Sequence, residues 1–163
     1  MLDLAKMLQQ TIIADNAFKA NHQVTLSGQQ GKERAYVQCD TALANLRSTA
    51  DLSNEANVSE ISQRYAAGLI GFLLIAAKQT WSQVIVMKPD DYQRLLKTKV
   101  SSDWDEHYLI TKRLIFNSYF EHRQDDFRHA WRLYLKFGLV DLKLSETAIR
   151  EAFEAQMEQV NQG

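Results

Sequence analysis

Three of the four histidines lie in one 23-residue segment that is rich in aspartate and glutamate: His107, His122 and His129. Imidazole and carboxylate groups bind transition metals and perform general acid–base catalysis. At a rise of about 1.5 Å per residue, His107 and His122 would lie about 22 Å apart along an unbroken helix, so they cannot bind one ion. The second half of the segment would therefore have to carry the chemistry.

Asp126 provides the spacing for such a site. It follows His122 by four residues and precedes His129 by three, so on a helix these side chains can share a face. His122 and Asp126 could bind a metal together with His129, or with Glu33 or Glu60 of a neighbouring helix. This pattern supports one alternative function, a metal-dependent hydrolase or oxidase using His122, Asp126 and His129. The competing interpretation is that these residues cover the solvated faces of two helices.

Motifs of the common enzyme classes are absent from the sequence. It contains no Glu-x-x-His pair, of which a di-iron bundle needs two. It also has no Gly-x-Ser-x-Gly turn, no Walker loop and no Gly-x-Gly-x-x-Gly. The single cysteine, Cys39, has no Cys or His at ligand spacing, and we expect it to be a small core residue. The sequence therefore implies no cofactor and favours a non-enzymatic protein, with catalytic residues undefined.

Basic residues at four-residue spacing suggest a second alternative, a nucleic-acid-binding regulator. Arg128, Arg132 and Lys136 fall on one side of an expected helix, and phosphate contacts require such a stripe. However, two aspartates precede the stripe, and 19 basic against 20 acidic residues give a formal net charge of -1. No global field therefore attracts nucleic acid. We favour the interpretation that the stripe is a solvated face.

The C-terminal segment, from Ser145 onward, predicts a helix with a complete apolar stripe that includes Ile149, Phe153 and Met157. Such a stripe packs either on its own bundle or on another chain. We take Ile149, Phe153 and Met157 as a candidate interface with another protein chain or with a second copy of this one. This interpretation predicts an exposed apolar or aromatic patch of several hundred square ångströms that includes part of the last helix.

Hydrophobic periodicity places these residues on helices. In residues 103–122 the aromatic and aliphatic side chains are expected to lie mostly inside, and Gly138 is a plausible stop for the helix that follows. Residues 21–31 and 48–57 are expected to be loops. The expected helices cover about residues 2–20, 32–49, 58–80, a short segment after Pro89, 103–122, 125–137, and 145 onward.

The segment from Ala66 to Ala77 contains twelve residues without a charge. It is too short to cross a bilayer, which takes about twenty apolar residues, so it predicts a buried helix at the centre of the bundle. Residues 83–87 are expected either to form a short strand or to extend this helix until Pro89 stops it.

These observations predict an all-α fold: one domain over residues 1–163, with six or seven helices around a central helix at about 58–80. Residues 1–10 include Asp3 and polar residues where a signal peptide would be apolar, so we expect a cytoplasmic protein that does not enter a membrane. The function that we favour is a non-enzymatic regulator or adaptor that binds other protein chains, with a homodimer as one form.

Overall fold

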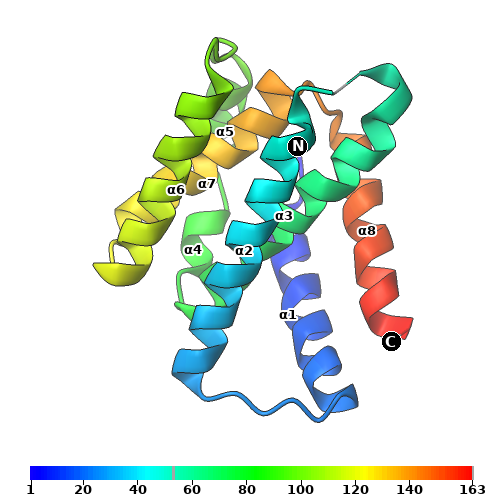
Figure 1. Cartoon of the computed structure of the whole chain (residues 1–163), viewed down its shortest axis with the longest axis vertical. Coiled ribbons are helices and arrows are strands. Elements are labelled where there is room, and N and C mark those ends of the chain that lie inside the picture. The colour runs from blue at the N-terminus through cyan, green and yellow to red at the C-terminus, as the bar shows by residue number, and fades with distance from the viewer. Residues whose placement is uncertain (53, 163) are drawn as a thin grey trace.

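The computed structural model describes residues 1–52 and 54–162, and it confirms an all-α fold (Figure 1). The described residues contain eight α-helices and no strand. This is one helix more than the upper expected number of seven, because the chain forms a separate short helix before Pro89. The α-helices are α1 (Leu4–Asn21), α2 (Gly28–Ala50), α3 (Val58–Lys78), α4 (Ser82–Ile85), α5 (Pro89–Leu96), α6 (Trp104–Phe120), α7 (Gln124–Lys136) and α8 (Glu146–Gln162). A 3₁₀ turn, η1 (Glu55–Asn57), precedes α3, and a π-helical turn, η2 (Phe137–Asp141), follows α7.

The start of α2 differs from the expected loop over residues 21–31. Ser27 forms a capping box, in which its hydroxyl accepts from the Gln30 amide at 3.1 Å and its own amide donates to the Gln30 side chain at 3.0 Å. This box satisfies exposed amides at the helix start, so Gly28 becomes the first helical residue and Gly31 lies within the helix.

The segment between α3 and Pro89 contains one short helix and no strand. Thr80 adopts a left-handed conformation with a φ of 58°, which ends the α3 helix, and Ser82 to Ile85 then form α4. Both expectations for residues 83–87, a strand and a continuation of α3, are therefore wrong. The indole N–H of Trp131 donates to the Ile85 carbonyl at 3.1 Å and holds α4 against α7.

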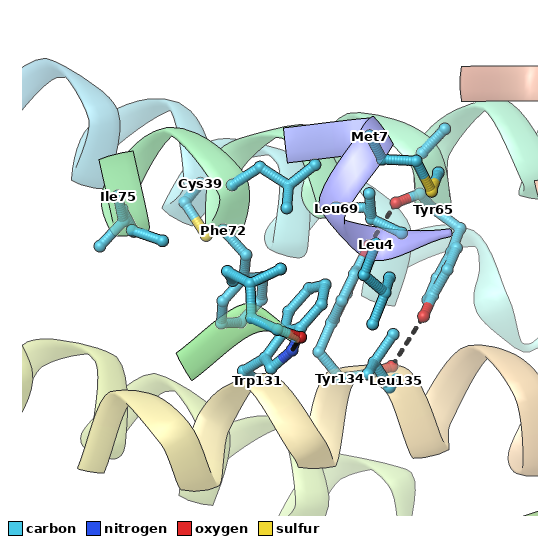
Figure 2. Packing of buried hydrophobic residues seen from close by; sticks show 14 of the residues in the cluster. Leu4, Met7, Cys39, Tyr65, Leu69, Phe72, Ile75, Trp131, Tyr134 and Leu135 are labelled. Carbon is cyan, nitrogen blue, oxygen red and sulfur yellow. Dashed lines mark hydrogen bonds between the residues drawn. The ribbon is translucent and has the colours of Figure 1, made fainter. Parts of the chain in front are cut away.

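Helix α3 contacts α1, α2 and α8 directly. Figure 1 shows α2 and α3 in the middle, with α6 and α7 on one side and α1 and α8 on the other. Figure 2 shows Leu69 of α3 beside Leu4 of α1 and Phe72 of α3 beside Trp131 of α7, and all four belong to a continuous core that runs from Leu2 to Met157. Within the described residues, no helix combines the length and apolarity needed to cross a bilayer.

Two buried tyrosines join α3 to α7. The hydroxyl of Tyr65 donates to the carbonyl of Tyr134 at 3.0 Å, and the hydroxyl of Tyr134 donates to the carbonyl of Tyr65 at 2.5 Å (Figure 2). The two rings stack with centroids 4.6 Å apart. Burial raises the pKa of both hydroxyls well above 10, so both stay protonated and remain donors.

Glycines give these rings their space. A Cβ at Gly68 would overlap the Tyr134 ring, and one at Gly138 would overlap the Tyr65 ring. Gly138 was expected to stop its helix, but the helical backbone continues through it as the π turn η2. Glycine is needed at position 138 for a steric reason. The position faces the Tyr65 ring, and any larger residue would push α3 and η2 apart.

We expect that Gly138→Ala lowers the free energy of unfolding by about 1–3 kcal/mol, the usual cost of overpacking a core. Gly71→Ala should cost a similar amount, because its Cβ would lie 2.7 Å from the Cα of Cys39, where no side-chain rotation relieves the contact. Gly28→Ala is the matched control: nothing lies within 4 Å of its Cβ, so its effect should stay within about 1 kcal/mol. Urea unfolding of the three variants measures these differences. Equal stability of all three would contradict the close packing described above.

Candidate functional site

Helix α6 is positioned by strong signals at both ends. Asp103 caps its start by accepting from the Glu106 amide at 3.0 Å, and acidic residues in the first turn complement the helix dipole. At the other end, His122 has a φ of 53°, a left-handed conformation that histidine adopts more readily than most residues. This conformation reverses the chain, so α6 and α7 form an antiparallel hairpin whose inner faces pack together.

The outer face of α6 is apolar and exposed. Leu109 is 65% exposed, Phe116 43% and Phe120 74%, and Val37 of α2 is 63% exposed. We name these four residues the α2/α6 face. We expected Leu109, Phe116 and Phe120 to lie mostly inside, and this expectation is wrong. Helix α6 has two apolar stripes, and only the one that contains Leu114 and Ile115 is buried.

Polar side chains hold α2 to α6 beneath this face. Lys112 has a side chain only 11% exposed, and its ammonium donates to the Asp40 carbonyl at 2.8 Å, pairs with the Asp40 carboxylate and lies 5.1 Å from the Tyr108 ring centroid. Further cross-helix contacts join Tyr36 to Ser118 at 2.9 Å, Gln29 to Tyr119 at 3.3 Å and Arg47 to Asp105 at 2.6 Å. The exposed apolar side chains therefore project from two helices whose relative position is held by these polar contacts.

A hollow of about 280 Å³ opens between the two helices at this face. Its charged rim is asymmetric. Glu33 and Asp40 lie on the α2 side. Arg113 follows Leu109 by four residues and precedes Phe116 by three, so it belongs to the outer stripe of α6. It is exposed on the side away from α2, because Lys112 occupies the side that contacts α2.

The basic stripe on α7 does not lie free on the surface. Arg128 pairs with Asp125 at 2.5 Å. Lys136 pairs with Asp141 at 3.1 Å and also donates to the Ser101 hydroxyl. Of these three residues, only Arg132 is exposed and makes no ion pair with another described residue. Two of the three cations therefore already have a carboxylate partner within the chain.

The histidine and carboxylate residues do not converge. His122 lies in the α6–α7 turn, His129 is exposed on α7, and Asp126 lies 3.9 Å from the guanidinium of Arg123. Glu33 accepts from Tyr119, and Glu60 pairs with Arg64. Within the described ranges, no group of three His, Cys, Asp or Glu residues could hold a metal ion. The metal alternative therefore has no geometric support.

The proposed interface on the last helix faces inward. Ile149, Phe153 and Met157 are all buried in the core, where α8 packs on α1 and α3. They are not available to a partner unless α8 leaves the bundle. The exposed apolar patch expected on α8 is instead found on α2 and α6. The signal for it was the recurrence of Leu109, Phe116 and Phe120 at seven and four residues, a stripe separate from the buried one.

Comparisons of the chain with models of protein families, with curated proteins and with solved structures find no match.

We expect Asp141→Ala to lower the free energy of unfolding by about 3 kcal/mol, because it leaves Lys136 buried without its partner carboxylate. The Asp141 side chain is fully buried and also accepts from the Ser101 amide at 2.8 Å. Asp125→Ala is the matched control, since its side chain is 90% exposed and an exposed pair contributes less than about 1 kcal/mol. Chemical denaturation of both variants gives the comparison. A cost below about 1 kcal/mol for Asp141→Ala would mean that Lys136 is solvated and free to bind phosphate.

Proposed function

We propose that this protein acts by binding other protein chains through the α2/α6 face, as a non-enzymatic regulator or adaptor, and that a second copy of the chain is its partner there. The observation that carries the proposal is the exposure of Val37, Phe116 and Phe120 around one hollow, with the exposed Leu109 further along the same stripe of α6. Monomers rarely leave a contiguous patch of large apolar side chains in water, and aromatic residues are enriched at protein interfaces. We place the protein in the cytoplasm, where a buried free thiol such as Cys39 is common.

Rigidity supports this use of the face. A binding surface costs less entropy when its side chains are ordered before the partner arrives. Beneath the exposed stripe, Tyr36, Tyr119 and Lys112 are each held by a contact between α2 and α6. Phe120 also packs edge-to-face on Tyr119, with ring centroids 4.9 Å apart. The aromatic anchors are therefore supported from below.

Charge complementarity favours a second copy as the occupant. A two-fold dimer is self-complementary, so a residue on one rim meets a residue on the opposite rim of the other copy. The α2 rim carries Glu33, and the outer side of α6 carries Arg113. A two-fold axis through Phe116 would bring Glu33 of each chain towards Arg113 of the other. Both ion pairs would then flank an apolar centre.

We expect the protein to shift from monomer to dimer with rising concentration in native mass spectrometry. Leu109→Ser combined with Phe120→Ser should weaken the dimer at least tenfold, because it removes the two most exposed apolar side chains of the interface. Leu52→Ser is the control for Leu109→Ser, since Leu52 is 66% exposed but lies in the loop after α2. This variant should dimerise like the natural chain. All changed side chains are exposed, so folding should be preserved, and circular dichroism checks it.

A charge exchange tests the geometry. Glu33→Arg alone and Arg113→Glu alone should each weaken the dimer by placing like charges together, whereas the double exchange should restore it. A chain that stays monomeric at every concentration, or a control variant that loses the dimer as well, would refute self-association at this face.

A further inference from the structure

A second hollow lies away from the α2/α6 face, between α1, α2, α3 and α8. Its volume is about 320 Å³, within the roughly 300–1,000 Å³ usual for small-molecule sites. Ile70 and Leu74 of α3, Phe18 of α1, and Met157 and Val160 of α8 line it. From Ala67 to Leu74 the α3 wall is about 10 Å long at 1.5 Å per residue. The hollow is therefore an elongated apolar groove of ligand size.

A smaller hollow adjoins one end of this groove and is basic, whereas Asp15 is the only charged residue among the described ones that lines the groove itself. Lys19 and Lys78 both contact the single carboxylate of Asp15, at 2.7 Å and 3.1 Å. Arg34 lines this smaller hollow together with both lysines, and the hollow shares Asp15, Phe18 and Leu74 with the groove. Three cations thus face one anion, in a chain whose overall formal charge is -1.

The lysine side chains are not fully solvated, with 24% and 27% of their surface exposed. Burial, and then the neighbouring ammonium of Lys19, lower the pKa of Lys78. Both causes disfavour the charged form of Lys78, and a bound anion would relieve the second. The excess of positive charge is therefore a local feature that an anionic group would stabilise.

We propose that this groove binds a fatty acid, with its carboxylate at Lys19, Lys78 and Arg34 and its acyl chain along Phe18, Ile70 and Met157. An apolar groove that ends in unbalanced cations matches a molecule with one apolar chain and one anionic end. Carboxylates form strong charge-assisted hydrogen bonds with lysine and arginine, and each buried methylene adds hydrophobic stabilisation. The groove is separate from the α2/α6 face, so fatty-acid binding in the groove does not depend on self-association.

Isothermal titration calorimetry with sodium dodecanoate, below its micelle concentration, tests this proposal on the intact chain. We expect one molecule to bind per chain, and binding to weaken from dodecanoate to decanoate to octanoate by about fourfold per methylene removed, the factor that ~0.8 kcal/mol per CH₂ implies. Dodecyltrimethylammonium has the same chain with a cationic end, and it should bind far more weakly.

Variants separate the two parts of the site. Arg34→Gln and Lys78→Met should each weaken dodecanoate binding about tenfold, because each removes a charged hydrogen-bond donor. Arg34 is exposed, so its variant should fold even if Lys78→Met does not. Ala67→Phe should block the groove, and Lys6→Gln, on an exposed part of α1, is the control that should bind normally. No binding of dodecanoate, equal binding of the cationic analogue, or unchanged binding by both charge variants would overturn the proposal.

Discussion

Tyr65 and Tyr134 each donate a hydrogen bond to the backbone carbonyl of the other, and their rings stack in the middle of the core. An unpaired buried hydroxyl or carbonyl would cost about 1–3 kcal/mol, so the two bonds satisfy groups that burial would otherwise penalise. Gly68 and Gly138 leave room for the rings. Because α6 leads into α7 through the turn at His122, this pair also determines how the α6–α7 hairpin lies on α3 and hence where the outer stripe of α6 points.

The two proposed binding surfaces follow from how α2 and α3 divide the bundle. On one side α2 meets α6 through polar contacts, which leave large apolar side chains above them without cover. On the other side α2 and α3 meet α1 and α8 around a groove that their side chains do not fill. The first surface is open and aromatic, which suits a flat protein partner, whereas the second is concave and has a charged end, which suits a small amphiphile. One helix, α2, contributes residues to both.

The sequence predicted most of the helices because apolar spacing and breaks recur clearly along the chain. The burial of each face was harder to predict, because α6 carries two apolar stripes and periodicity does not say which one a neighbour covers. The stripe on α8 was equally ambiguous, and Ile149, Phe153 and Met157 proved to be core residues. The ion pair of Lys136 with Asp141 depends on the π turn between them, which spacing alone does not reveal. The capping box at Ser27 was missed, although Gln30 stands three residues later, because Gly28 and Gly31 indicated a loop over residues 21–31.

A double-mutant cycle on the tyrosine pair tests most directly whether it acts as one unit that joins α3 to α7. The free energy of unfolding is measured for the natural chain, Tyr65→Phe, Tyr134→Phe and the double variant. Loss of one hydroxyl should loosen the stacked pair and weaken the other bond, so we predict a coupling free energy of about 1–3 kcal/mol. Strict additivity, with a coupling below about 0.3 kcal/mol, would show that the two bonds act independently and would contradict the account.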